Sequence, residues 1–392
     1  MAGSYIVAGA RTPIGKMSGA LAGFSAADLG GFAIKAALER AGVAPDEVEH
    51  VIMGQVLMAG QGQVPSRQAA VKAGIPMSVP SINVNKVCLS GINAIYLADQ
   101  MIQSGDADIV IAGGMESMTN APYLLQKARG GYRIGHDRIF DHMMLDGLED
   151  AYEPGRSMGT FGEDCAAKYS FTRAEQDAFA TASVQRAKAA TETGAFAAEI
   201  APVTVKGRGG DTVISVDEGP GKVKLDKIPT LKPAFKKDGT ITAASSSSIN
   251  DGAAALVMMT AATAAKLGCK PLARIVSHAV HAQEPEWFAT APVGATRKAL
   301  DKAGWNVADV DLWEVNEAFA VVPMALMKDL NLSHEIVNVN GGACALGHPI
   351  GASGARIMVT LIHALKARGL RKGLATLCIG GGEATAVALE LL

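Results

Sequence analysis

The second half of this chain repeats the first half at three places, in the same order and at nearly the same offset. The matching segments are residues 33–43 with 295–305, 82–85 with 337–340, and 111–116 with 378–383. Repetition of this kind indicates that the chain folds as two related units. A site built between two such units takes side chains from both, so residues far apart in the sequence have to be considered together.

Strand and helix patterns alternate in both halves, which is typical of an α/β layered fold. The predicted strands cover residues 5–10, 51–55, 107–112, 312–315 and 374–377. The predicted helices cover residues 25–41, 66–73, 172–193 and 252–266. Ser25 is an N-cap candidate and Gly42 a C-terminal stop, while Gly113 and Gly114 are expected to end the third strand.

A long insertion is expected between about Ser117 and Asn250, where regular periodicity is lost. Its most convincing helix begins at Thr172, because Glu175 stands three positions on, as a capping box requires. Residues 206–237 carry eight Lys/Arg against four Asp/Glu, which indicates either a solvated loop or a surface that receives phosphates. We therefore divide the chain into an N-terminal half (1–117 with 250–268), an inserted loop domain (118–249) and a C-terminal half (269–392).

Charge and cysteine content restrict the possible partners and the compartment. The net charge of −2 and a pI near 6.5 do not indicate a nucleic-acid-binding surface over the whole molecule. No basic leader precedes an apolar core, and no uncharged run approaches the length of a membrane span. Five cysteines without paired ligand spacing predict reduced thiols in the cytoplasm and no metal site.

Cys88 lies where a strand-like alternation over 82–87 changes to helical spacing. A thiol at such a corner lies near the first free N–H groups of a helix and the positive end of its dipole, and both favour the thiolate. Cys88 is therefore a candidate nucleophile. The alternative is a small buried cysteine that packs under the helix.

His348 occupies the mirrored position in the second half, in the segment Gly347-His348-Pro349. Pro349 favours an extended backbone at His348, and the glycine beside it leaves room for a ligand to approach the imidazole. An accessible imidazole opposite a cysteine suits proton transfer. The alternative is a structural histidine that only donates hydrogen bonds.

Two further strand ends carry polar groups. Cys378 ends a buried strand, and the glycines from Gly380 to Gly382 leave backbone N–H groups free to face an anion, unless they only make a tight turn. Asn316 and Glu317 follow another strand, where a helix N-cap is the alternative. Cys344, near His348, is interpreted as a packing residue.

Several enzyme classes are disfavoured by the motifs. The glycine clusters lack the spacing of a dinucleotide-binding or Walker motif, and no Gly-x-Ser-x-Gly elbow is present. Two cysteines, a histidine and an asparagine at strand ends fit covalent thioester chemistry better.

At this level of detail the chain resembles the thiolase family, and within it the biosynthetic acetyl-CoA acetyltransferases, over nearly its full length. The resemblance rests on residues 87–91, 316–320, 340–354 and 378–382. It implies a five-layered αβαβα fold with two related halves, and an inserted loop domain that covers the substrate. It also implies a homotetramer.

The resemblance implies a role for each candidate residue. Cys88 would attack the thioester of an acyl-CoA while His348 takes its proton, and Cys378 would deprotonate C2 of a second acetyl-CoA. His348 and a water held by Asn316 would stabilise the enolate, and backbone N–H groups of Cys88 and Gly380 would bind the acyl carbonyl. The implied activity is the reversible condensation of two acetyl-CoA to acetoacetyl-CoA and CoA, without a metal or a permanent cofactor.

Coenzyme A contacts are assigned by the same resemblance to Phe235, Ala243, Ser247 and Phe319. The chain departs from the family at two places. Residues 244–248 read Ala-Ser-Ser-Ser-Ser where relatives often have Gly-Asn-Ala-Ser-Gly, which is expected to stiffen the loop. Residues 288–289 are Phe-Ala where many have Met-Gly, which puts a bulkier ring near the acyl pocket.

Three alternatives remain at this stage. A degradative 3-ketoacyl-CoA thiolase of broader chain length would use the same residues. A decarboxylating ketoacyl synthase would not need a base at Cys378, and a non-catalytic acyl-CoA binding protein would not need the four residues together.

Overall fold

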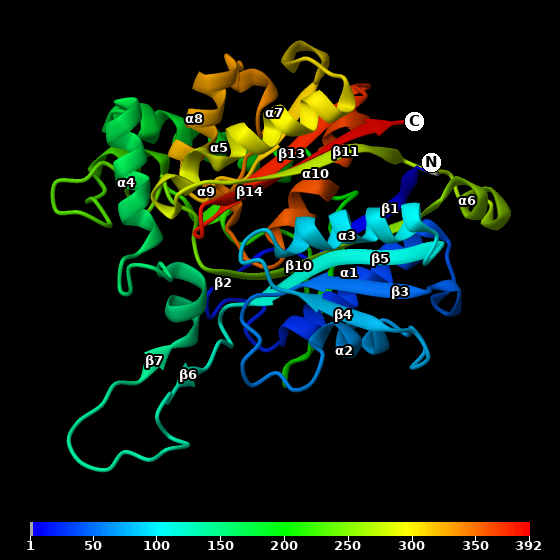
Figure 1. The fold of residues 1–392 in the computed structure, drawn as a ribbon, viewed down its shortest axis with the longest axis horizontal. Coiled ribbons are helices and arrows are strands. Elements are labelled where there is room, and N and C mark those ends of the chain that lie inside the picture. Colours follow the sequence, from blue (N-terminus) through cyan, green and yellow to red (C-terminus); the bar gives the residue numbers. More distant parts are fainter. Residues whose placement is uncertain (1–2) are drawn as a thin grey trace.

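The computed structural model describes residues 3–392 and contains one continuous ten-stranded sheet, whose two halves, called here the first and the second sheet, have matching topology. The first sheet is formed by β1 (Ser4–Arg11), β3 (His50–Gly54), β4 (Ser81–Val84), β5 (Ile109–Ser117) and β10 (Asn250–Thr260). The second is formed by β11 (Ala273–Ala282), β12 (Leu312–Val315), β13 (Lys372–Ile379) and β14 (Glu383–Leu391). The two sheets join edge to edge where β1 pairs with β11 (Figure 1).

The pairing confirms that the halves are related. In the first sheet the order is β4-β3-β5-β10-β1, and in the second β12-β13-β14-β11 follows the same sequence of parallel and antiparallel neighbours. A single bridge from Trp313 to Val337 takes the place that β4 holds in the first half. Both β1 and β11 also carry a register shift near their start, between Ile6 and Ala8 and between Ile275 and Ser277. A shared irregularity at the same strand position is a feature of the fold.

Helices make three layers around the sheets. The central layer consists of α3 (Ser90–Ser104) and α10 (Ser353–Arg368), whose apolar side chains pack against strands of both halves. The outer faces are covered by α1 (Ala26–Ala41) and α2 (Pro65–Lys72) on one side, and by α7 (Ala291–Ala303) and α8 (Val321–Leu330) on the other. The predicted five-layered αβαβα arrangement is confirmed (Figure 1).

Helix ends follow the sequence signals closely. The hydroxyl of Ser25 accepts the N–H of Asp28 and closes a capping box at the start of α1, while Gly42 ends that helix with a φ of 66°. Thr172 and Glu175 form the predicted capping box of α5 (Arg173–Glu192). These caps satisfy backbone groups that the first and last helical turns leave free, so they fix the boundaries locally.

The helix predicted over 252–266 is wrong. Residues 250–260 form strand β10 at the centre of the first sheet, and the short helix α6 (Ala261–Leu267) begins only after Thr260. A strand buried on both faces reads as a continuous apolar run without alternation, so periodicity does not distinguish it from a buried helix.

The strand predicted to end before Gly113 is also longer than expected, since β5 continues to Ser117. A Cβ atom on Gly113 would lie 2.3 Å from the carbonyl oxygen of Ala254 on the neighbouring strand. The glycine therefore permits a close approach between two strands and does not mark a turn.

The segment between β5 and β10 adds no strand to these two sheets. Its regular elements are β6 (Tyr123–Leu124), β7 (Phe140–Asp141), a π-helix (Met144–Leu148), α4 (Met158–Tyr169), α5, β8 (Val203–Val205) and β9 (Thr212–Ile214), with 3-10 turns at Pro220–Lys222 and Leu225–Thr230. Helix α4 has no counterpart among the predicted helices. The hairpin of β6 and β7 projects away from the body (Figure 1).

The remaining elements are short. They are β2 (Gly15–Lys16), α9 (Ala343–Leu346) and 3-10 turns at Pro45–Glu47, Pro285–Thr290, Val307–Asp309 and His334–Ile336. Over residues 3–392, no helix combines the length and apolar character needed to cross a membrane.

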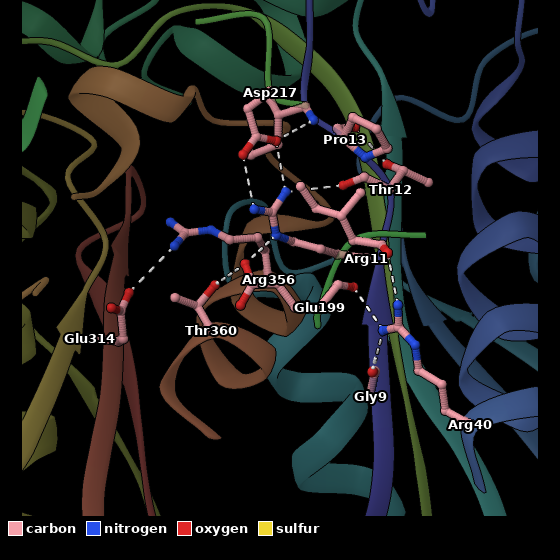
Figure 2. Close-up of polar contacts among 12 residues, drawn as sticks. Gly9, Arg11, Thr12, Pro13, Arg40, Glu199, Asp217, Glu314, Arg356 and Thr360 are labelled. Atoms are coloured by element: carbon pink, nitrogen blue, oxygen red, sulfur yellow. Dashed lines mark hydrogen bonds and ion pairs between the residues drawn. The ribbon is translucent and has the colours of Figure 1, made fainter. Parts of the chain in front are cut away.

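A buried network of charges attaches the inserted segment to both halves (Figure 2). Arg11 on β1 has no exposed side-chain surface and pairs with Glu199 at 2.5 Å and with Asp217 at 2.7 Å. On the side of α10, Thr360 donates a hydrogen bond to Glu199. Because paired charges in a dry interior are costly to separate, these contacts hold the inserted segment in one position over the body.

Candidate active site

Cys88 lies at the predicted corner between strand and helix. Helix α3 begins at Ser90, and the Ser90 hydroxyl accepts the backbone N–H of Lys86 at 2.9 Å. Val87, directly before the thiol, has a φ of 46°. A β-branched residue in the left-handed region is strained by about 1–3 kcal/mol and persists only where the surroundings hold it.

The corner itself lowers the pKa of the Cys88 thiol through a backbone N–H, as predicted, but the surroundings act in the opposite direction. Burial raises the pKa of the Cys88 thiol to about 12, with a smaller contribution in the same direction from the charge of Glu116, and the backbone N–H at the corner offsets only part of this. Loss of hydration therefore outweighs the helix terminus. Cys88 carries its proton at neutral pH.

His348 is held in one orientation by its loop. Gly347 has a φ of 105°, and a Cβ atom there would lie 2.2 Å from the side chain of Asn250. The backbone N–H of His348 donates to the Ser248 carbonyl and to Asn250 Oδ1, both at 3.2 Å. The glycine thus allows two neighbouring chain segments to close around His348.

The tautomer of His348 follows from its hydrogen bonds. His348 Nδ1 lies 2.5 Å from Ser353 Oγ, and the Ser353 hydroxyl donates its own proton to the Pro349 carbonyl at 3.1 Å. Since the Asn316 amide nitrogen that faces Nε2 can only donate, we assign the tautomer in which Nδ1 donates to Ser353 Oγ and Nε2 is the base. Burial, with a smaller contribution from the Arg356 charge, lowers the pKa of His348 to about 3. The imidazole of His348 is therefore neutral, and so is the Cys88 thiol on the neighbouring turn.

Asn316 follows β12 and faces His348. Its Nδ2 lies 3.5 Å from His348 Nε2, and its Oδ1 is buried with no hydrogen-bond partner among the described residues. A buried amide oxygen without a partner is the kind of group that binds an ordered water. Glu317 is not an N-cap, because its carboxylate accepts Ser183 Oγ, Asn338 Nδ2 and the backbone N–H of Cys344.

Cys378 and Gly380 stand at the end of β13. Burial raises the pKa of the Cys378 thiol well above its usual range, and a negative charge on Cys88 raises it further. A Cβ atom on Gly380 would lie 2.3 Å from Met158 Sδ. A side chain at this position would require Met158 to move.

The starts of α3 and α10 are in direct contact, which brings the Cys88 and His348 segments together. A Cβ atom on Gly91 would lie 2.9 Å from the backbone nitrogen of Ala355 and 3.0 Å from the Gly351 carbonyl oxygen. The repeat thus places the two mirrored corners side by side across the central helix layer.

An apolar cavity of about 250 Å³ opens beside His348. Its walls are Met118, Met144, Leu148, Ser157, Met158, Gly159, Phe235, Ser247, Ser248, Ile249, Phe319, His348 and Ile350. Three of the four residues assigned to coenzyme A therefore lie around one space with the histidine. Cys88 and Cys378 do not line it; Cys88 packs against the apolar cluster to which Met118 and Ile350 of its wall belong.

Ala243, the fourth such residue, lines a separate cavity of about 330 Å³. That cavity is basic, with Lys222, Lys224 and Lys227 in its wall, and it also contains Cys344. The three lysines belong to the segment whose charge suggested phosphate binding. Residues 243–248 connect the two cavities along the chain.

The departures from the family pattern have structural explanations. Ser246 Oγ donates to the Thr242 carbonyl at 3.0 Å and Ser248 Oγ to Asn250 Oδ1 at 2.8 Å, so the additional hydroxyls tie down the loop as expected. Phe288 does not line the cavity beside His348. It is buried behind Phe319, with ring centroids 6.3 Å apart, so its bulk supports the wall and does not narrow the space directly.

Glu116 was not singled out from the sequence, although it ends a strand as the other candidates do. Its buried carboxylate accepts the backbone N–H groups of Val56, Leu57 and Gly351 at 2.9–3.2 Å. Burial raises the pKa of Glu116 to about 7. A carboxylate next to Gly351 helps to hold the loop that carries His348.

Models of two known domains cover almost the whole chain. "Thiolase, N-terminal domain" matches residues 4–262 and "Thiolase, C-terminal domain" matches residues 269–391. The chain belongs to the thiolase family. The recognition made from the sequence motifs is confirmed.

Relatives of this thiolase agree in name. An "Acetyl-CoA acetyltransferase" of Chromobacterium violaceum is 53% identical over 98% of both chains, and one of Shinella zoogloeoides is 51% identical over 99% of both. Among solved structures, the Acat5 thiolase from Ascaris suum in complex with coenzyme A is 42% identical, with a TM-score of 0.95 over 100% of both chains. The Bacillus anthracis acetyl-CoA acetyltransferase has a TM-score of 0.96 at 42% identity.

Proposed function

We propose that this thiolase is an acetyl-CoA C-acetyltransferase that condenses two acetyl-CoA to acetoacetyl-CoA and CoA, and catalyses the reverse thiolysis. The observation that carries the proposal is the imidazole of His348, which lines the apolar cavity and whose Nε2 lies 3.5 Å from Asn316 Nδ2. The same activity is supported by the names of relatives. About half of their residues are identical to those of this chain over the full length.

The first half-reaction transfers an acetyl group to Cys88. His348 Nε2 takes the thiol proton as sulfur attacks the thioester carbonyl, and the C–S bond to coenzyme A breaks. Cys378, which is protonated at rest, supplies a proton to the leaving thiolate and becomes a thiolate itself. Because the Cys88 thiol and His348 are neutral at rest, proton transfer has to accompany attack.

The second half-reaction forms the carbon–carbon bond. The Cys378 thiolate removes a proton from C2 of a second acetyl-CoA, and the carbanion attacks the acetyl carbonyl on Cys88. The enolate oxygen would be met by protonated His348 and by a water bound to Asn316, and the acetyl carbonyl by the N–H groups of Cys88 and Gly380. His348 then returns its proton to the Cys88 sulfur as the product leaves.

Coenzyme A would occupy both cavities. The pantetheine arm would run past Ser247 between Phe235 and Phe319, and the phosphate-bearing end would lie at Ala243 among the three lysines. Lysine ammonium groups attract phosphates as point charges. On this proposal residues 118–249, which the sequence analysis assigned to an inserted loop domain, cover the ligand.

Radioactive acetyl-CoA tests the assignment of roles. Cys88→Ala should abolish covalent labelling of the protein, whereas Cys378→Ala should still be labelled but should not turn over. Equal labelling of the two variants would contradict the roles. Cleavage of acetoacetyl-CoA by CoA, followed through loss of the absorbing enolate, separates the enzyme from a non-catalytic acyl-CoA binding protein.

A degradative thiolase of broader chain length is the second candidate. The small volume of the apolar cavity, about 250 Å³ with Met144, Leu148 and Met158 in its lining, favours the acetyl-specific enzyme. A comparison of thiolysis rates for 3-oxoacyl-CoA substrates of increasing length, with one 2-methyl-branched substrate, distinguishes the two. Equal rates for short and long chains would favour the degradative enzyme.

A homotetramer is the proposed assembly, for two reasons. Strand β4 is the last strand of its sheet among the described residues, and Ile82 on it is 47% exposed, so a second copy can pair with this edge. The β6–β7 hairpin exposes Ile134 by 98% and Ile139 by 64%. Ile134→Asp with Ile139→Asp should convert a tetramer into dimers in light scattering. An unchanged mass would show that the hairpin is not an interface.

The cytoplasm remains the proposed location. All five cysteines of the sequence lie in the described part and are free thiols, as expected for a reducing compartment.

A further inference from the structure

An ion pair crosses from the Cys88 turn to the Gly380 turn. Lys86 Nζ lies 2.6 Å from Glu383 Oε2, with side chains 27% and 34% exposed. Lys86 precedes Cys88 by two positions, and Glu383 is the first residue of β14, three positions after Gly380. The pair therefore joins the two halves at the turns that carry the two proposed carbonyl-binding N–H groups.

A second contact runs beside the ion pair. Thr385 Oγ1 on β14 donates to Asn93 Oδ1 on α3 at 3.0 Å. Asn93 lies in the first turn of α3, seven positions after Lys86, and Thr385 lies two positions after Glu383, so both contacts join the Cys88 segment to the start of β14. Together they hold the start of α3 against the start of β14.

The Cys88 turn depends on such external support. Val87 holds a φ of 46°, which a β-branched residue does not adopt without constraint from its surroundings. Within the turn, the hydroxyl of Ser90 bonds the N–H of Lys86 and the Val87 carbonyl, but these contacts are local to the first half. Only contacts that cross to the second half fix its distance from Gly380.

We propose that Lys86 and Glu383 are positioning residues that set the separation between the N–H groups of Cys88 and Gly380. The inference rests on the proposed function, because those groups then bind the same carbonyl oxygen. A partly exposed ion pair contributes little to global stability. A small displacement of an oxyanion-binding group, by contrast, lowers the rate about 100-fold in well-studied cases. The pair should therefore affect turnover more than folding.

The test uses Lys86→Met, Glu383→Gln and the charge-exchanged double variant Lys86→Glu/Glu383→Lys in the full-length enzyme. Each single variant should lower kcat for thiolysis about tenfold, with the KM for CoA changed less than about twofold. The double variant should recover most of the lost kcat. The control is Glu390→Gln, at the far end of the same strand, where Glu390 pairs with Arg274 at 2.6 Å; its kcat should be unchanged.

Unchanged kcat in both single variants would overturn the inference. So would a double variant no faster than the single ones, since that pattern indicates that Lys86 or Glu383 acts independently, for example by contacting substrate. A raised KM without a change in kcat would have the same meaning. Failure of the unmodified protein to cleave acetoacetyl-CoA would instead contradict the proposed function, so the two failures are distinguishable.

Discussion

His348 Nδ1 lies 2.5 Å from Ser353 Oγ, and we assign the proton of this hydrogen bond to Nδ1. Ser353 is the first residue of α10, and its hydroxyl lies 3.1 Å from the Pro349 carbonyl oxygen, to which it can donate. The start of one helix thus decides which nitrogen of the histidine is the base. The hydrogen bond made by one ring nitrogen of a catalytic histidine sets the orientation of the ring and determines whether the other nitrogen is the base.

Ser353→Ala should slow acetylation of Cys88 by about 10- to 100-fold, because it leaves a buried N–H without a partner and removes the preference for the Nε2 base. Rapid-quench measurement of enzyme acetylation by acetyl-CoA checks this. Ser104→Ala, at the exposed end of α3, is the matched control and should acetylate at the normal rate. Normal acetylation of Ser353→Ala would show that the loop alone positions His348.

The alkylation rate of Cys88 should depend on pH as expected for a thiol that is protonated at neutral pH. With a pKa of about 12 for Cys88 and about 3 for His348, no thiolate–imidazolium pair exists near neutrality. The rate of inactivation by iodoacetamide should therefore rise about tenfold per pH unit over most of the range from about pH 7 to pH 10, without a plateau. Cys88→Ser identifies the part of the rate that belongs to Cys88. A plateau that begins near pH 7 would indicate a preformed ion pair.

Glu116 should affect the alkylation rate of Cys88 only at pH values above the pKa of its own carboxyl group. Its pKa of about 7 means that it is largely neutral at pH 6 and charged at pH 8, and the charge raises the pKa of Cys88. Glu116→Gln should thus leave the alkylation rate near normal at pH 6 and increase it about three- to tenfold at pH 8. The ratio of the two rates is the decisive quantity. A ratio that does not depend on pH would show that the substitution acts only by shifting the loop.

Arg11→Met should destabilise the protein by about 3–5 kcal/mol, because it leaves the Glu199 and Asp217 carboxylates buried without their cation. Urea unfolding, followed by circular dichroism, measures the loss. Lys206→Met breaks an ion pair whose lysine is 81% exposed, so its free energy of unfolding should change by less than about 1 kcal/mol. Equal changes in the two variants would contradict the role given to burial.

The sequence alone determined the duplication, the strand-helix alternation and the residues with reactive groups. These features are local or repetitive: a capping box at Ser25 or Thr172 is complete within four residues, and the repeated segments can be compared directly. The motifs around Cys88 and His348 also identified the family. The apolar run over β10 led to the wrong prediction of a helix, because a strand buried on both faces lacks the alternation of apolar and polar residues seen in a strand with one exposed face.

Only the tertiary structure decided the state of the reactive groups. The helix terminus beside Cys88 suggested a thiolate, but the extent of burial, which depends on packing from both halves, keeps the proton on sulfur. The partners of Glu116 and Lys86 likewise come from segments far away in the chain, as do Asn250 and Asn316 beside His348. The pKa of a thiol depends on how far it is removed from water, and the distance between two segments depends on contacts between the two halves. Neither can be read from a local pattern of residues.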